Sequence, residues 1–590
     1  MRLAVKKMTE IKRLLKYSLD YKWWFIAGNI LMVLMVFFQL LGPLIIMTVI
    51  DDHIRLGEGN INVEAVIRLL IIYALIKLFH AVAAYYAQII LQSSGAKVVQ
   101  SIRHQVFEHI QKLPVRYFDN LPAGKVVARI TNDTESMLQF FTYVLPMFLV
   151  NGLTMIAITA AIFIVNIYAG IIMLIFVPII LLWLILYRKY SNDYNHMKRE
   201  RNSDMNAAIN ESINGMTTIQ VFNREDQIED EFRKLNDEYT DSATKLVKLN
   251  GLSGDNLAGV MQSFVFALMV IIFSLAFLSP AETLTVGTMY LLVDYITRFF
   301  TPLYEIVGQI EIFEQARVAA VKVFEMLDEE EEVEDQGRLE SFDGGIDFRN
   351  VSFFYKEGHL VLKDINLSVD RGETVGLVGH TGSGKSSIIN LLMRFYDPTE
   401  GRILFSGRDT KEINKKDLRK NISIVLQDPF IYAGTLLYNI RLNNEDISRE
   451  AAEEALLEVG GRELMKKLDG GLDAWLPERG ATLSLGERQL VSFARALAFD
   501  PKVLVLDEAT SNVDSETEQL IQHAMKVVSR KRTTFIIAHR LSTIQHADQI
   551  IILEEGNIME QGNHQRLMGM NGIYAEMFNM QVTDKNMPNA

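Results

Sequence analysis

The chain has 590 residues, of which 49% are hydrophobic, and its formal net charge is −13 at pH 7. This length is too great for a single domain, and the acidic balance argues against nucleic acid as a main partner. The sequence contains no cysteine, which excludes disulfides, thiolate-bound zinc and a cysteine nucleophile. We expect no cleaved signal peptide, because the basic start runs into an apolar stretch that is too long and lacks a small-residue cleavage site.

The first 325 residues contain long apolar runs. Six of them reach the ~20 residues that a membrane-spanning helix needs, at about 23–50, 63–91, 140–164, 169–186, 257–278 and 289–307. Residues 1–325 are therefore predicted to form a six-helix, all-α transmembrane domain in contact with the lipid bilayer. Lys and Arg gather before the first span and after the second and fourth, so the positive-inside rule places both termini in the cytoplasm.

Two of these basic connections, about 92–139 and 187–256, are very long and helical in pattern. At 1.5 Å per residue, ~25 residues of continued helix would reach ~38 Å below the bilayer. We expect turn-like tips near 116–124, where Pro and Gly interrupt the pattern, and near 210–225. The tips would present contact points in the cytoplasm; ordinary cytoplasmic hairpins are the alternative.

Ionisable residues fall within or at the edge of the spans: Lys77, His80, Asp294, Arg298 and Glu305. Each charge there costs at least ~2.5–3.5 kcal/mol on insertion scales, so such residues usually face protein or a water-filled cavity. Asp294 and Arg298 are four residues apart and could pair on one helix face. Two interpretations follow: these residues line a translocation cavity, or they form a structural ion pair or snorkel to the membrane interface.

Residues 326–345 are predicted to form an acidic linker, residues 346–580 an α/β domain and residues 581–590 a tail. In the α/β domain the strand-like "GETVGLV" runs directly into "GHTGSGKS", which matches G-x-x-x-x-G-K-[ST] in its strand–loop–helix setting. Backbone N–H groups of such a loop wrap phosphate, Lys385 reaches the β and γ oxygens, and Ser386 is placed for Mg²⁺. The candidate ATP-binding residues are Gly379, His380, Thr381, Gly382, Ser383, Gly384, Lys385, Ser386 and Ser387.

Two later strands also end in residues suited to phosphate chemistry. The run "KVLVLDEATSNVD" ends its apolar part at Asp507, a candidate magnesium-associated carboxylate. Glu508 follows and could polarise a water for in-line attack on the γ-phosphate. The run "TTFIIAH" ends in His539, a candidate γ-phosphate contact for which a purely structural role is the alternative.

The order and content of these motifs resemble the nucleotide-binding domain of ATP-binding-cassette transporters. The resemblance implies that Tyr355 in "VSFFY" stacks on adenine, that Gln427 in "VLQDPFIYAGT" touches Mg²⁺ and the membrane domain, and that Asp514 in "SNVD" lies in the D-loop. It also implies catalytic roles for Glu508, His539 and Gln427, and Mg²⁺ contacts for Ser386, Gln427 and Asp507.

The resemblance covers nearly the whole chain. Its membrane part, including "LPVRYFDNLPAGKVVARITND" and "ESINGMTTIQVFNRE", looks like the exporter class that fuses six membrane helices to one ATPase domain. In that class the tips near 116–124 and 210–216 would couple the two domains.

The stretch "TLSLGERQ" occupies the place of the family's signature loop, normally LSGGQ, which binds the γ-phosphate of ATP held by the other subunit. Ser484 and Gly486 match that pattern, whereas Leu485 and Glu487 depart from it. Glycine allows close backbone approach and unusual φ, and leucine denies both. Glu487 also adds negative charge near a polyanion, so we predict a phosphate site that is real but damaged.

The chain's own Walker A, Walker B and His-switch motifs are intact in sequence. Pairing with a different half, one with an intact LSGGQ and a degenerate Walker B, would give one hydrolytic and one degenerate ATP site. This pattern resembles bacterial heterodimeric multidrug exporters, which implies ATP-driven export of hydrophobic or amphipathic compounds across a bacterial plasma membrane. A homodimer that works slowly with LSLGE, a lipid or peptide exporter, and a membrane-anchored ATP-binding regulator are the alternatives.

Overall fold

The computed structural model describes residues 11–54, 62–119, 121–253, 255–277, 285–332, 337–339, 342–507, 515–538 and 540–586. The chain divides into two compact units. The membrane unit comprises Met1–Leu113 and Leu121–Glu330, and the nucleotide unit comprises Pro114–Asn120 and Glu331–Ala590. The short segment 114–120, at the first predicted cytoplasmic tip, thus belongs with the nucleotide unit.

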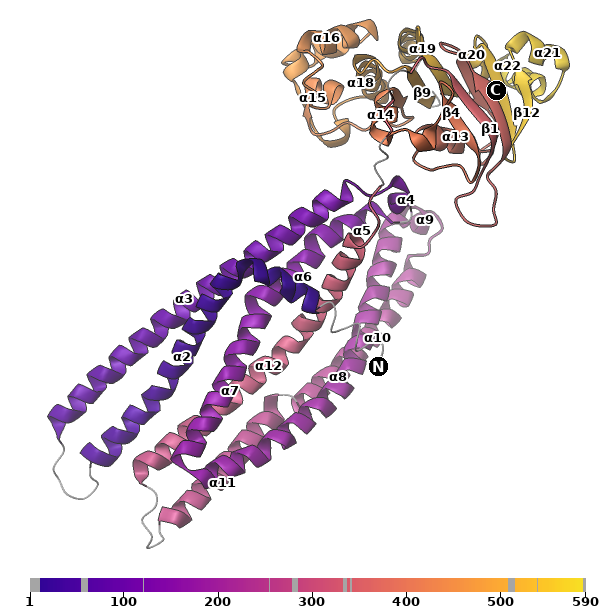
Figure 1. The fold of residues 1–590 in the computed structure, drawn as a ribbon. Helices are drawn as coiled ribbons and strands as arrows, with labels where there is room; N and C mark the ends of the chain where they lie inside the picture. Colours follow the sequence, from indigo (N-terminus) through magenta and orange to yellow (C-terminus); the bar gives the residue numbers. More distant parts are fainter. Residues whose placement is uncertain are drawn as a thin grey trace. The chain divides into compact units, whose positions relative to one another are not determined.

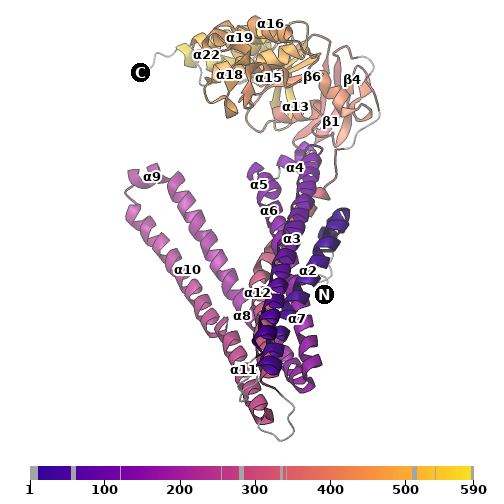
Figure 2. The same ribbon diagram turned by 90° about the vertical axis from the view of Figure 1, so that its left-hand side faces the viewer.

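The membrane unit is built from long helices (Figures 1 and 2). The six predicted spans lie in α2 (Lys22–Thr48), α3 (Val63–Ile110), α7 (Leu145–Val165), α8 (Ile167–Asn214), α11 (Asp255–Phe277) and α12 (Val286–Leu327). The other elements of this unit are η1 (Leu19–Tyr21), η2 (Val49–His53), α5 (Ala123–Ala128), η3 (Arg129–Asp133), α6 (Thr134–Gln139), η4 (Phe140–Val144), α9 (Met216–Val221) and the long α10 (Glu225–Ser253).

Within the described residues, three helical stretches are long and apolar enough to cross a membrane: 11–53, 63–110 and 123–165. The other three predicted spans are helical too. In α12 the charges of Asp294, Arg298 and Glu305 interrupt the apolar run, and the side chains of α8 and α11 are described only in part.

Side-chain caps define where three of the long helices begin. The side chains of Asn62, Asn166 and Thr285 accept hydrogen bonds from the backbone N–H groups of residues 65, 169 and 288, respectively. Each cap satisfies one of the donors that a helix start leaves unpaired. With 48, 48 and 42 residues, α3, α8 and α12 are about twice as long as a bilayer requires.

The nucleotide unit contains two main sheets (Figure 1). The larger has the order β12-β11-β3-β10-β9-β6, and all of its strands are parallel except β12. These strands are β12 (Asn557–Gly562), β11 (Gln549–Glu554), β3 (Thr374–Val378), β10 (Thr533–Ile537), β9 (Val503–Asp507) and β6 (Ile422–Val425). Every residue of β10 is buried, as expected for a central strand covered on both faces.

The second sheet is antiparallel, with the order β2-β1-β4-β5, and a two-stranded ribbon pairs β7 with β8. Their bounds are β1 (Ile346–Phe353), β2 (Leu362–Val369), β4 (Glu400–Phe405), β5 (Arg408–Asp409), β7 (Gly434–Thr435) and β8 (Trp475–Leu476).

The helices of this unit are α4 (Val115–Asp119), α13 (Lys385–Leu392), α14 (Lys415–Lys420), α15 (Leu436–Arg441), α16 (Arg449–Glu458), α17 (Arg462–Lys467), α18 (Leu485–Ala498), α19 (Ser515–Ser529), α20 (Leu541–Ile544), α21 (His564–Met570) and α22 (Ile573–Asn586), with 3₁₀ turns η5 (Thr410–Glu412), η6 (Gly471–Asp473) and η7 (Glu478–Gly480).

Two apolar cores hold the nucleotide unit together. One includes Ile388 of α13, Phe405 of β4 and Val505 of β9, and so joins the antiparallel sheet to one face of the parallel sheet. The other packs α18, through residues such as Val491, against the opposite face, which includes Leu504. The parallel sheet is therefore fixed on both sides, and its strand ends are rigid supports for a site.

Candidate nucleotide site and membrane cavities

The parallel strands bring several predicted site residues to one edge of the sheet. Ile537 of β10 lies opposite Leu377 of β3 on one side and opposite Asp507 of β9 on the other. The loop after β3, the end of β9 and the end of β10 therefore meet at the carboxyl edge, where open α/β sheets bind ligands. Gln427, two residues beyond β6, is exposed at this edge. Glu508, Asp514 and His539 lie outside the described residues.

The loop between β3 and α13 has the shape of a phosphate cradle. Gly384 has φ +108° and Gly379 has φ +154°, and a Cβ at Gly384 would lie 2.6 Å from Leu362 Cδ2. At Gly382, which has φ +85°, a Cβ would meet nothing within 4 Å, so the loop is open at this point. The buried Ser383 Oγ has no hydrogen-bond partner within the described residues. This loop leads into the N-terminus of α13, a favourable place for an anion.

Lys385, the first residue of α13, is only 8% exposed. Its Nζ donates hydrogen bonds to the carbonyl oxygens of Gly379 at 2.6 Å and His380 at 3.0 Å. Burial lowers the pKa of Lys385, and the nearby Asp507 carboxylate opposes that change. The loop thus curls around the ammonium group and holds it where phosphate oxygens would arrive. Ser386 and Thr381 are exposed beside it.

Tyr355 stands beside α13 and is 44% exposed. Its hydroxyl donates to Ser387 Oγ at 3.1 Å and accepts from Asn390 Nδ2 at 2.9 Å. Its ring meets those of Phe353 and Tyr396 edge to face, with centroids 4.7 and 5.0 Å apart. The predicted adenine-stacking residue is therefore held in position while part of its ring stays accessible.

Tyr396 links this aromatic group to α4, the short helix at the first tip. Its hydroxyl donates a hydrogen bond to the carboxylate of Asp119, within the nucleotide unit. Burial and this hydrogen bond raise the pKa of Tyr396 above its usual value. Sequence reasoning missed Tyr396, because only the fold brings it next to Asp119, 277 residues away.

The signature stretch begins α18 with a capping box. Ser484 Oγ accepts from the backbone N–H of Glu487 at 3.2 Å, and Glu487 Oε2 accepts from the backbone N–H of Ser484 at 2.7 Å. Lys467 Nζ donates to the other carboxylate oxygen, Oε1, at 2.7 Å. Partial burial would raise the pKa of Glu487, but the bonds from Lys467 and Ser484 lower it overall. Glu487 is thus ionised at neutral pH, and its charge is balanced by a lysine.

The backbone at Leu485 is that of an ordinary helix start. Leu485 is the first residue of α18 and is absent from the residues with positive φ, so leucine creates no backbone strain at this position. The glycine that packing requires is Gly486, where a Cβ would lie 2.1 Å from Thr517 Cγ2 of α19. The departures from LSGGQ at 485 and 487 are thus carried on an unstrained helix start.

The ionisable residues of the membrane unit separate into two groups. Asp294 and Arg298 pair on one face of α12, as their spacing predicted, and Arg298 Nη2 donates to Asp294 Oδ1 at 3.2 Å. Tyr295 beside them is buried, and its hydroxyl donates to the carbonyl of Leu40 at 2.8 Å. Glu305, by contrast, lines a cavity.

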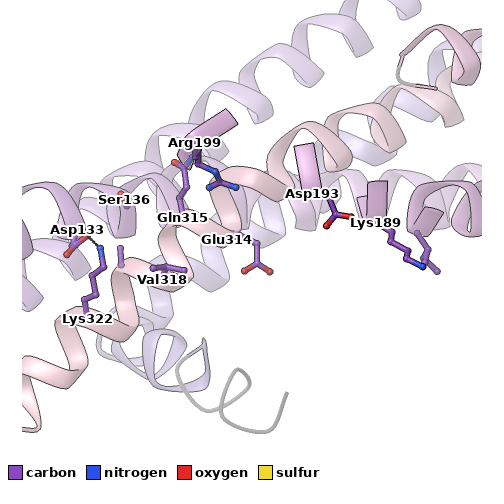
Figure 3. A pocket seen from close by; sticks show the side chains of 11 residues that line it. Asp133, Ser136, Lys189, Asp193, Arg199, Glu314, Gln315, Val318 and Lys322 are labelled. Atoms are coloured by element: carbon purple, nitrogen blue, oxygen red, sulfur yellow. Dashed lines mark ion pairs between the residues drawn. The ribbon is translucent and has the colours of Figure 1, made fainter. Parts of the chain in front are cut away.

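A large cavity and a smaller one lie among the described residues of the membrane unit. The larger, of about 840 Å³, has mixed charge: Lys189, Asp193 and Arg199 come from α8, and Glu314 and Lys322 from α12 (Figure 3). Lys322 Nζ lies 3.5 Å from Asp133 Oδ1, the contact drawn in Figure 3. The smaller, of about 510 Å³, is lined by residues of α2, α3, η4, α7 and α12 and is mainly apolar.

A phosphate-binding loop at the edge of a parallel sheet, joined in one chain to a unit of membrane-length helices, defines an ATP-driven membrane transporter. The family comparisons agree: residues 25–303 match the family described as ABC transporter transmembrane region, and residues 362–511 match the family described as ABC transporter. The chain belongs to the ATP-binding-cassette transporter family, and it is an ATP hydrolase coupled to export.

Similar proteins extend over nearly the whole chain. The "Probable multidrug resistance ABC transporter ATP-binding/permease protein YheH" of Bacillus subtilis is 45% identical over 89% of this chain and 78% of its own length. The "Multidrug resistance-like ATP-binding protein MdlB" of Buchnera aphidicola is 32% identical over 97% of this chain and 98% of its own. A solved bacterial Atm1-family ABC exporter with ATP bound is 28% identical, has a TM-score of 0.77, and covers 96% of this chain and 99% of its own.

Proposed function

We propose that this chain is one half of a heterodimeric exporter that moves hydrophobic or amphipathic compounds of the multidrug type across the bacterial plasma membrane. Both termini lie in the cytoplasm in this proposal. The proposal of one hydrolytic and one degenerate ATP site rests on a contrast. The phosphate cradle around Lys385 is complete, whereas the signature loop carries the ionised carboxylate of Glu487. The multidrug names of the relatives support the substrate class.

The hydrolytic site would use this chain's Walker motifs and the partner's LSGGQ. Lys385 and the loop 379–384 would hold the β- and γ-phosphates, and Tyr355 would stack on adenine. Ser386, Gln427 and Asp507 offer the hydroxyl, amide and carboxylate oxygens that Mg²⁺ accepts, and they converge at the carboxyl edge. The ion would supply charge neutralisation at the phosphates when bound.

The remaining catalytic roles belong to residues outside the described part of the chain. Glu508 would orient and polarise the attacking water, His539 would contact the γ-phosphate, and Asp514 would lie in the D-loop. In phosphoryl transfer the protein mostly positions groups and stabilises charge, so the fixed strand ends β9 and β10 are suitable supports.

The degenerate site would pair this chain's signature with a partner whose Walker B is degenerate. Glu487, whose carboxylate is paired with Lys467, would stand next to the triphosphate, and Leu485 places an apolar side chain at the first turn of α18. Such a site binds ATP and seldom cleaves it.

A homodimer has one observation in its favour. Leu485 sits in α18 without a positive φ, so the loop LSLGE keeps an ordinary helix start. A homodimeric lipid or peptide exporter with two slow sites is thus the second candidate, and an ATP-binding regulator without transport is the least supported.

Inside-out vesicles test the export function. ATP should drive accumulation of a fluorescent amphipathic dye in vesicles that contain the chain together with the half-transporter encoded beside it. Vesicles with the Glu508→Gln chain are the matched control, since they should bind ATP without turnover. Equal accumulation with and without ATP would overturn the proposal.

A further inference from the structure

We infer that the 510 Å³ cavity of the membrane unit is a binding site for lipophilic organic cations, in which Glu305 is the counter-ion, Asn151 orients its carboxylate and Gln309 adds a second polar side chain. This inference rests on the proposed export function and names the substrate class of the transport path. The volume is within the range of pockets that hold drug-sized ligands.

Glu305 is the charge of this cavity. Among the described residues that line it there is no Lys, Arg or His, so the side chains give the cavity a net charge of one negative unit. Asn151, which is 5% exposed, donates from Nδ2 to Glu305 Oε2 at 2.9 Å. This neutral amide orients the carboxylate without cancelling its charge, and Oε1 has no hydrogen bond within the described residues.

The contrast with Asp294 shows what a structural pair looks like on the same helix. Asp294 is bridged by Arg298 one turn away, whereas Glu305 has no cation within the described residues. Glu305 is exposed near the end of the predicted span 289–307, and an ionised carboxylate at that place needs either water or a positive charge. A bound ammonium or phosphonium group would supply that charge.

Gln309 adds a second polar group on the same face of α12. It is four residues after Glu305 and lines the same cavity, and its Oε1 is buried without a hydrogen-bond partner among the described residues. The carboxylate of Glu305 is therefore the group that a cation would meet first, and a turn of the Gln309 amide would bring its Oε1 toward the same charge. An anion would instead meet the negative charge of Glu305.

The rest of the wall suits an apolar body of variable shape. Met32 and Met35 of α2, Met147 of α7 and Tyr143 of η4 face the cavity together with aliphatic side chains. Methionine adapts its shape to irregular partners, and an aromatic ring attracts a cation to its face. The wall therefore favours greasy cations over compact hydrophilic ones.

The test compares tetraphenylphosphonium with tetraphenylborate, two ions of the same shape and opposite charge. The full transporter assembly in nanodiscs should bind tetraphenylphosphonium more tightly than tetraphenylborate, with empty nanodiscs subtracted. Glu305→Gln should weaken tetraphenylphosphonium binding roughly 10- to 100-fold, the range for a lost charge-assisted contact. Glu305→Asp should keep most of the binding. Glu311→Gln, on the same helix but outside the cavity wall, should leave it unchanged.

The outcomes distinguish a failure of the cation site from a failure of the export function. Tetraphenylborate bound as tightly as tetraphenylphosphonium by the unaltered protein, or equal binding by the Glu305→Gln variant, would overturn the cation site. ATP-driven accumulation in vesicles is measured in parallel. Accumulation that ignores Glu305 would refute this inference while export stands. Glu305-dependent binding without any accumulation would support the site and refute export.

Discussion

The Glu487→Gln substitution separates two effects of the unusual signature: its ion pair, which stabilises the fold, and its negative charge, which opposes ATP binding. Glutamine also completes a capping box, so the start of α18 is kept and only the ion pair with Lys467 is lost. The two side chains are 19% and 57% exposed, and pairs of this kind contribute about 0.2–1 kcal/mol. We therefore expect a small loss of thermal stability together with tighter ATP binding at the site this loop completes, because a negative charge beside the triphosphate is removed.

Binding at that second site is measured in a Lys385→Ala background, which removes the chain's own phosphate cradle. The titration of labelled ATP then reports the site that this signature forms with the partner's Walker motifs. Glu463→Gln, which removes a surface charge paired with Lys466, is the matched control and should change nothing. Unchanged ATP affinity in the Glu487→Gln variant would refute the reasoning and show that Lys467 already neutralises the charge. With Leu485→Gly added, ATP turnover should rise; no rise would place the remaining defect in the partner's Walker motifs.

Three further predictions address the nucleotide unit. Tyr355→Ala should weaken ATP binding by roughly 1–3 kcal/mol, the contribution of base–aromatic stacking, in a titration of labelled ATP with Lys385 intact, whereas Tyr355→Trp should retain binding. Equal affinity of the alanine variant would remove Tyr355 from the adenine site. Tyr396→Phe removes the hydroxyl that donates to Asp119, and it should lower the substrate-stimulated ATPase rate more than the basal rate. An unaltered ratio of the stimulated to the basal rate would contradict a coupling role for this contact. Burial would raise the pKa of Glu332, but its bonds with Arg419 and Lys415 lower the pKa overall. The ionised Glu332 therefore stabilises the fold above its unfolded-state pKa, and this stabilisation is lost as the pH falls through its folded-state pKa. Acid unfolding followed by fluorescence should show this loss, and Glu332→Gln should flatten the pH dependence.

Much of the nucleotide site was predictable because its signals are local. The strand that ends at Val378, the glycines and Lys385 are contiguous in sequence, and the pattern requires a strand–loop–helix setting that the structure has. The class of protein and the ATPase activity followed from the same residues. The capping box of Ser484 and Glu487 was also readable as S-x-x-E before an apolar run, and sequence reasoning passed over it.

What could not be predicted depends on contacts between distant parts of the chain. Lys467 reaches Glu487 across 20 residues, and Asn151 reaches Glu305 across 154. A sequence pattern gives the cost of a charge at Glu305 but not whether a cation or an amide faces it. The same limit applies to Leu485, since the φ of a residue at a helix start depends on where the helix begins.

The central claim is that one hydrolytic site uses this chain's Walker motifs opposite a different subunit. The most direct test is the ATPase activity of the chain purified alone and of the chain purified with the half-transporter encoded beside it, each with and without Glu508→Gln. The account predicts activity only in the pair, and its near-complete loss on that one substitution while ATP binding persists. Full activity from the chain alone would contradict it and would make LSLGE a working signature in a homodimer.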